Sequence, residues 1–302
     1  MRLKRALAAI LVLGTAAAGA FVYGTAPAPL PAATWQGLGE PDLANGEQVF
    51  SAGGCVSCHA APGAPDDQKR VLAGGRALKS PFGTFHVPNI SPDAEAGIGG
   101  WTLAEFGNAM TRGVGRRGEH LYPSFPYASY ARMTPKDVND LFGYLKTLPA
   151  STHVAPGHDL PFPFNVRLAL GGWKLLYLND APRVELADAD GTLARGRYLV
   201  EGPGHCGECH TPRDFLGGLK VDQWLAGGPN PEGEGRIPNI TPGERGLGGW
   251  SEGDIASYLE TGFTPEFDSV GGSMVEVQKN MAKLPAADRE AIAAYLKAIP
   301  AR

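Results

Sequence analysis

All four cysteines of this 302-residue chain fall in two copies of one five-residue pattern. The copies are Cys55-Val56-Ser57-Cys58-His59 and Cys206-Gly207-Glu208-Cys209-His210. Two thiols separated by two residues can each form a thioether with one vinyl group of a porphyrin, and the histidine that follows can bind the iron. The pattern therefore predicts two covalently bound haem c groups, held by Cys55, Cys58, His59, Cys206, Cys209 and His210.

Other uses of a C-x-x-C pair fit this chain less well. A structural zinc site usually brings four ligands together from one small module. Here the two pairs lie 151 residues apart, and each has its own histidine. A thioredoxin-like dithiol needs a βαβ context, which the flanking sequences do not show. A structural disulfide or a zinc site is the alternative interpretation.

The N-terminus has the features of an export signal. Arg2, Lys4 and Arg5 precede a mostly apolar stretch over residues 6–24, and positive charges before an apolar run start such signals. Haem attachment to this motif takes place outside the cytoplasm. A 19-residue helix also nearly crosses a hydrocarbon core of about 30 Å. We expect an uncleaved inner-membrane anchor with the rest of the chain in the periplasm. The alternative is a soluble protein after signal cleavage. A Pro/Ala tether over residues 25–33 is expected to stand off the membrane.

Composition narrows the class of partner. The formal charge is −4, and it becomes −7 without the three N-terminal basic residues. An acidic chain disfavours nucleic-acid binding and gives no reason to expect attraction to anionic lipid. The 42 glycines and 26 prolines indicate many turns and loops. A length of 302 residues makes two domains the natural expectation.

Four sequence landmarks recur at offsets of 149 to 153 residues. They are LAGG at 72 and 225, PNI at 88 and 238, GGW at 99 and 248, and a 13-residue segment at 137–149 and 288–300. A near-constant offset indicates one duplicated domain. The expected boundaries are 1–33 for the signal or anchor and tether, 34–150 for the first domain, 151–190 for a linker and 191–302 for the second domain.

Each predicted domain reads as a small helical unit, so the predicted fold class is all-α. Helices over 45–52 and 193–201 lead into the two motifs, and Pro/Gly-rich loops follow. Short helices over 102–112 and 251–261 begin at Thr102 and at a capping-box-like Ser-Glu-Gly-Asp. A final helix after Thr134 carries an apolar stripe, which is expected to pack against the first helix.

The iron of each haem has a second axial position, and a methionine there raises the reduction potential. Met133 precedes the last helix of the first domain and is the favoured ligand; Met110 is expected in the core. In the second domain Leu284 takes the equivalent of position 133, so Met274 and Met281 both stay open. Pro88 and Pro238 are expected to orient the proximal histidines through a neighbouring carbonyl. The histidines at 86, 120, 153 and 158 are expected at the surface.

Longer segments extend the likeness beyond the haem motifs. They are PNISPDAEAGIGGW, RRGEHLYPSFPYASYARMTPKDV, PNITPGERGLGGW, GGSMVEV and the linker PFPFNVRLALGGWKLL. In these segments the chain resembles the cytochrome c subunit of periplasmic alcohol, gluconate and related sugar dehydrogenases. The resemblance implies tandem duplicated class I cytochrome c domains. It also implies a distal methionine from the Y-x-x-M-T/S position, Met133, and from the G-G-x-M position, Met274, ahead of Met281. Those subunits usually carry three haem domains.

These features favour a dihaem electron carrier over an enzyme. The expected partners are a periplasmic dehydrogenase and a downstream cytochrome or oxidase. The alternative is a dihaem peroxidase, which needs a haem that can open to peroxide; a methionine ligand in each domain argues against it. A thiosulfate-oxidising enzyme with a cysteine distal ligand would need a fifth cysteine.

Overall fold

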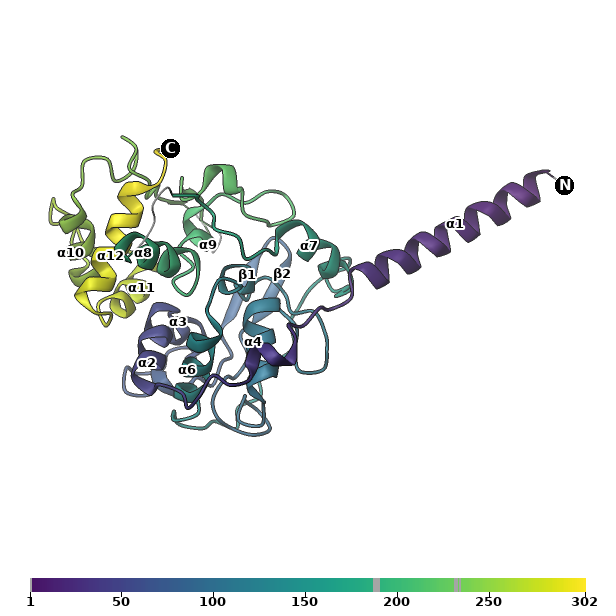
Figure 1. Ribbon diagram of the computed structural model, residues 1–302, viewed down its shortest axis with the longest axis horizontal. Helices are drawn as coiled ribbons and strands as arrows, with labels where there is room; N and C mark the ends of the chain where they lie inside the picture. The colour runs from purple at the N-terminus through teal and green to yellow at the C-terminus, as the bar shows by residue number, and fades with distance from the viewer. Residues whose placement is uncertain (1, 187–190, 231–232, 234) are drawn as a thin grey trace.

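The computed structural model describes residues 2–186, 191–230, 233 and 235–302. Met1 of the predicted export segment and residues 187–190, at the end of the predicted linker, lie outside the described residues. The chain is mostly helical, and its N-terminal helix α1, Arg2–Gly24, projects away from the rest of the molecule (Figure 1). This agrees with the predicted helical class and the predicted N-terminal apolar helix.

The remaining helices are short. The α-helices are α2 Leu43–Ala52, α3 Cys55–His59, α4 Leu103–Arg112, α5 Tyr127–Tyr130, α6 Pro135–Leu145, α7 Ala169–Tyr177, α8 Gly191–Glu201, α9 Gly207–His210, α10 Glu252–Thr261, α11 Met274–Met281 and α12 Ala286–Ala298. Three 3-10 turns are η1 Ala32–Trp35, η2 Lys69–Val71 and η3 Val221–Gln223. Two antiparallel hairpins pair β1 Ala77–Ser80 with β2 Gly83–His86, and β3 Gly228–Pro229 with β4 Arg236–Ile237.

In the first half, α2 and α6 cross in direct backbone contact. Asp42 caps α2 by accepting hydrogen bonds from Ala44 N and Asn45 N. A Cβ atom on Gly46 would lie 2.2 Å from the backbone oxygen of Asp140 and 2.7 Å from the Cβ of Tyr144. Only glycine lets the two helices approach this closely.

The second half repeats this crossing with α8 and α12. A Cβ atom on Gly196 would lie 1.9 Å from the backbone oxygen of Ala291 and 2.9 Å from the Cβ of Tyr295. Gly196 follows Gly46 by 150 residues, and Tyr295 follows Tyr144 by 151 residues. The residues of the two crossings are therefore separated by the same spacing, about 150 residues, as the repeated sequence segments.

Each half has its own apolar core. The first core includes Phe50, Phe106, Leu141 and Leu145, and the stripe predicted on the final helix is buried in it. The second core includes Leu199, Trp224, Ile255 and Leu296. The cap predicted at Thr102 and the capping box predicted at Ser251 are both present, and each forms a full capping box, with Glu105 and Asp254 respectively.

Some structure lies where sequence analysis predicted only loops. Helix α7 forms inside the predicted linker, and α11 forms in the segment that carries both Met274 and Met281. The segment predicted as a Pro/Ala tether, residues 25–33, runs along the body. Leu30 N donates a hydrogen bond to Asn108 Oδ1 at 2.7 Å, and Trp35 packs over Gly107. Trp35 lies just after this segment, and burial of its apolar ring favours the docked arrangement.

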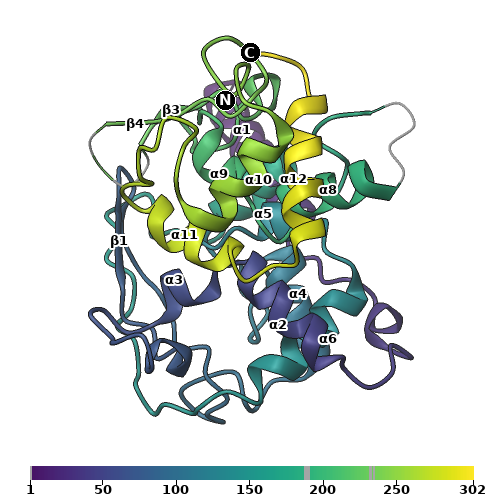
Figure 2. The same ribbon diagram turned by 90° about the vertical axis from the view of Figure 1, so that its left-hand side faces the viewer.

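The two halves lie side by side (Figures 1 and 2). Helices α2, α3, α4 and α6 belong to one half, and α8, α10, α11 and α12 to the other (Figure 2). Helix α11 faces α3 in this view, and Asn280 Nδ2 of α11 donates a hydrogen bond to Ser57 Oγ of α3 at 3.0 Å. The first C-x-x-C-H motif therefore lies at the boundary between the halves.

Candidate functional site

The first motif forms a single short helix, α3. Gly54 precedes it in the left-handed region, with φ of 55°, and turns the chain sharply after α2. His59 Nδ1 lies 2.8 Å from the backbone oxygen of Pro88. A carbonyl oxygen only accepts, so Nδ1 carries the proton and donates it. Nε2 therefore carries no proton and keeps its lone pair. Nε2 is the atom that an iron would bind.

The second motif has the same geometry. Cys206 is the N-cap of α9, and His210 ends that helix. His210 Nδ1–H donates to the backbone oxygen of Pro238 at 2.9 Å. Carbonyl groups at Pro88 and Pro238 thus hold both histidine rings, which confirms the role predicted for the two prolines.

A glycine of each LAGG segment binds the backbone of the histidine. Gly74 N donates to the backbone oxygen of His59, and Gly227 N donates to that of His210, both at 2.7 Å. Gly74 has φ of 75° and Gly227 has φ of 73°, and a Cβ atom on either would lie 2.7 Å or less from the backbone of the adjacent Pro-Asn segment. Sequence analysis noted the LAGG repeat but did not predict this role. The available signal was a glycine that recurs after each motif, 15 residues after His59 and 17 residues after His210.

Burial sets the charge of these groups. It lowers the pKa of His59 to about 4, although the Pro88 carbonyl acts in the opposite direction. Burial also lowers the pKa of His210, against the Pro238 carbonyl. The pKa of the Cys55 thiol and that of the Cys206 thiol are each raised to about 12, mainly by burial. Both imidazoles are therefore neutral at pH 7, as an iron ligand must be.

The methionines divide between the two cores. Met110 and Met133 are both buried in the first core. In the second half Met274 begins α11 and is half-buried, whereas Met281 ends the same helix and is 4 % exposed. Leu284, at the position equivalent to Met133, is also buried.

The donor set of each half fits haem c. It offers two thiols one helical turn apart, a neutral imidazole with a single available nitrogen, and buried thioether sulfurs. No disulfide joins the four cysteines in the described structure. Within residues 2–186, 191–230, 233 and 235–302, no group of three or more His, Cys, Asp or Glu side chains gathers as a metal site, which leaves the zinc interpretation without a ligand set there.

Both motifs lie against the boundary between the halves. His205, directly before Cys206, donates from Nε2 to the backbone oxygen of Gly53 at 3.2 Å. Its ring also meets that of Tyr130 edge-on, with centroids 5.5 Å apart. Glu208 lies inside the second motif and accepts a hydrogen bond from Ser129 Oγ at 2.6 Å. Arg213 bonds the other carboxylate oxygen of Glu208 at 2.6 Å.

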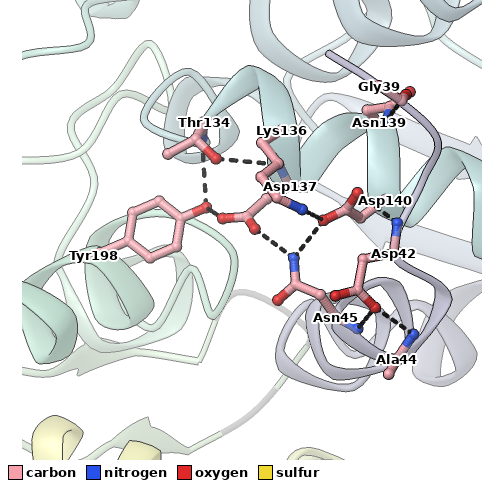
Figure 3. A network of polar contacts seen from close by, with 10 residues as sticks. All are labelled: Gly39, Asp42, Ala44, Asn45, Thr134, Lys136, Asp137, Asn139, Asp140 and Tyr198. Atoms are coloured by element: carbon pink, nitrogen blue, oxygen red, sulfur yellow. Dashed lines mark hydrogen bonds and ion pairs between the residues drawn. The ribbon is translucent and has the colours of Figure 1, made fainter.

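A second polar network joins the halves on the side of α8 (Figure 3). The Tyr198 hydroxyl of α8 donates to Asp137 at the start of α6. Asn45 Nδ2 of α2 donates to Asp137 Oδ1 and to Asp140 Oδ2, both at 2.7 Å. Lys136 Nζ completes the network by donating to Asp140 Oδ2 at 2.6 Å (Figure 3). The network ties the α2–α6 crossing of one half to α8 of the other.

One of the histidines expected at the surface is buried. His120 is 5 % exposed, and its Nε2–H donates to the backbone oxygen of Thr25 at 2.9 Å. The prediction is wrong for His120 because the chain following α1 covers it. His120 is distant in sequence from both motifs and makes its contact with the N-terminal segment.

Comparison with known proteins identifies the family. The family model for cytochrome c matches residues 43–149. A protein of Cereibacter sphaeroides named "Diheme cytochrome c-type" is 52% identical over 299 residues, which cover 99% of each chain. The chain belongs to the cytochrome c family. It is a cytochrome c-type electron-transfer protein with haem c as its cofactor.

Two further relatives carry the names of dehydrogenase subunits. The cytochrome is 37% identical to the fructose dehydrogenase cytochrome subunit of Gluconobacter japonicus, over 94% of its own length and 57% of the relative's. It is 36% identical to the gluconate 2-dehydrogenase cytochrome c subunit of Pantoea cypripedii, over 85% of its own length and 59% of the relative's. The cytochrome thus spans little more than half of these two relatives. The resemblance to such subunits, first noted in the sequence, is confirmed.

Proposed function

We propose that this cytochrome is a dihaem electron carrier of the periplasm, which receives electrons from a dehydrogenase and passes them to a cytochrome or terminal oxidase. The observation that carries the proposal is the pair of C-x-x-C-H motifs, each of which contacts the other half at one interface. Each motif has its histidine fixed by a proline carbonyl. The names of the relatives support a dehydrogenase as the electron donor.

Two tandem copies of one haem domain, 34–150 and 191–302, would carry the two groups. The matching glycine crossings and the matching proline and glycine contacts support this duplication. Cys55 and Cys58 would hold one haem, with His59 and Met133 as axial ligands. Cys206 and Cys209 would hold the other, with His210 and Met274.

Each bound haem supplies a one-electron ferric/ferrous couple. The protein's own residues keep that couple fixed in place. The carbonyls of Pro88 and Pro238 lock the tautomer of each histidine, and such hydrogen bonds also raise the basicity of the ligand. The contacts of His205 and Asn280 hold the two motifs in one relative position. None of these side chains loses or gains a proton in this role.

Helix α1 would anchor the cytochrome to the inner membrane. It has 23 residues, none of them buried, and is the one helix among the described residues that is long and apolar enough to cross a bilayer. Its basic residues lie at the N-terminal end, which would place that end in the cytoplasm and the haem domains in the periplasm. A cleaved signal is the alternative.

Near-infrared spectroscopy of the ferric protein tests the axial ligands. A methionine bound to ferric haem gives an absorption band in this region, so Met133→Ala should remove about half of the band in a protein with two such irons. Adding Met274→Ala should remove the remainder. Met281→Ala, from the other end of the same helix, is the matched control and should leave the band unchanged. Loss of the band in Met281→Ala would contradict the assignment of Met274, and peroxide turnover at enzymatic rates would contradict the carrier.

A further inference from the structure

A group of large apolar side chains is exposed where α1 meets the body. Phe162, Leu175, Leu176 and Phe215 are 81%, 69%, 63% and 87% exposed. They come from the segment before α7, from α7 itself and from the turn after α9. Contiguous exposed apolar surface usually marks a binding face. The meaning of these side chains therefore depends on whether they share one surface.

Direct contacts join the three segments. Trp173 Nε1 of α7 donates to the backbone oxygen of Leu216 at 3.1 Å, next to Phe215. Phe82 meets Phe164 edge-on, with centroids 5.1 Å apart, and also contacts the turn at Gly217. Residues 161–177 and 214–218 therefore form one continuous surface, which we call the apolar collar.

The collar is packed against the end of α1. A Cβ atom on Gly171 would lie 2.2 Å from the backbone oxygen of Thr25, and one on Gly172 would lie 3.3 Å from the ring of Phe21. Thr25 is 4 % exposed and accepts the hydrogen bond from His120. Helix α1 therefore leaves the body directly beside α7 (Figure 1).

The polar atoms of three charged side chains of the collar have hydrogen-bond partners within the protein. Lys174 Nζ donates to the backbone oxygens of Arg112 and Gly113 at 2.8 and 2.7 Å. Arg167 donates to the backbone oxygen of His120 at 2.7 Å, and Asp214 accepts from the Tyr177 hydroxyl at 2.7 Å. The collar thus presents apolar side chains, with Trp173 and Tyr177 among them, and these two residue types are enriched where a bilayer meets water.

We propose that the apolar collar lies in the interfacial layer of the bilayer that α1 spans, with lipid as its occupant. The proposal rests on the membrane anchor under Proposed function. A helix that crosses the bilayer and ends against the collar brings Phe162, Leu175, Leu176 and Phe215 to the depth of the headgroups and upper acyl chains. There the lipid covers surface that water would otherwise meet.

Spin labels on the full-length haem-loaded protein test the collar. The four native cysteines would be consumed by thioethers, so Phe215→Cys provides a single site for a nitroxide. Phe267→Cys is the matched control, because Phe267 is 86% exposed and lies in the loop after α10, outside the collar. Both proteins are placed in vesicles of phosphatidylcholine and phosphatidylglycerol that contain no other protein. Electron paramagnetic resonance then measures how often the nitroxide collides with oxygen, which enters lipid, and how often it collides with a nickel chelate, which stays in water.

The expected result is an oxygen-to-nickel collision ratio several-fold higher at position 215 than at position 267. Equal ratios, in protein that stays in the vesicles after an alkaline wash, would overturn the collar and leave the anchor intact. Release of the chain by the alkaline wash would overturn the anchor and the collar together. Contact with a second copy of the chain would lower both collision rates without raising their ratio, so a raised ratio at position 215 reports lipid.

Discussion

At the residue scale, the two proximal histidines depend on backbone carbonyls and not on side chains. Sequence analysis located Pro88 and Pro238 because they recur with the motifs, and their carbonyl groups do orient the rings. The residues alone left Met274 and Met281 both open, and only the family resemblance favoured Met274; the structure places both on α11. Ligand choice depends on which sulfur reaches the iron in three dimensions, and a spacing of seven residues on one helix puts both candidates on similar faces.

Asp140 gives a prediction at this scale. Its side chain is fully buried and accepts hydrogen bonds from Asp42 N at 2.9 Å, from Asn45 and from Lys136. Burial favours the neutral acid, but these donors outweigh it and keep the pKa of Asp140 below its ordinary value. The stabilisation is therefore present above the unfolded-state pKa and is lost as the pH falls through the lowered pKa.

Asp140→Asn should lower the free energy of unfolding at pH 7 by about 1 to 3 kcal/mol. The difference in unfolding free energy between the variant and the native protein should start to narrow below about pH 4, where the unfolded-state carboxylate becomes protonated. It should close further as the pH falls through the lowered pKa of Asp140 in the folded state. Denaturant unfolding across this range measures both effects. Asp67→Asn, on an exposed loop, is the control and should change neither. A gap that stays constant with pH would contradict the role of the charge.

At the element scale, two helix crossings define the two halves. Periodicity and caps predicted most of the helices, because these signals lie within one segment. Gly46 and Gly196 were missed, since their requirement comes from a helix about 95 residues away. Helices α7 and α11 were missed because their flanking sequences are rich in glycine and proline, which indicates loops.

Gly46→Ala tests the first crossing. The new methyl group would lie 2.2 Å from the backbone oxygen of Asp140, so α2 and α6 must separate. We expect a loss of about 2 kcal/mol or more in the free energy of unfolding. Gly253→Ala is the matched control, because Gly253 is exposed on α10 and its nearest neighbour is 3.6 Å away. Thermal melts should show that control as neutral or slightly stabilised; equal melting temperatures for both variants would contradict the close crossing.

At the scale of the whole molecule, several sets of contacts join the halves. Sequence reasoning did not predict them, because Ser57 and Asn280 are 223 residues apart and no periodic pattern links them. The duplication offset relates each half to the other in sequence, but it contains no information on how the halves dock. That information lies in the shapes and polar groups of both surfaces.

Tyr198→Phe tests whether the halves unfold together. It removes the hydroxyl that donates to Asp137 and leaves the ring in place. We expect a loss of about 1.5 to 3 kcal/mol, as for a hydrogen bond to a charged group, and calorimetry should resolve two transitions where the native protein shows one. Tyr258→Phe is the control, since Tyr258 packs against Trp250 without a hydroxyl bond among the described contacts. A single transition at the native temperature in Tyr198→Phe would show that the network does not couple the halves.

The docked segment between α1 and the body has a consequence for how partners are met. Residues 25–35 are held by the Thr25 and Leu30 bonds and by the buried Trp35 ring, so they do not act as a flexible leash. With α1 in a bilayer, the body would keep one height and one tilt above the membrane. A membrane-bound partner would then meet the cytochrome by lateral diffusion, with the orientation of the cytochrome body already fixed. Much of the rotational entropy that association usually costs would therefore be lost before the two proteins meet.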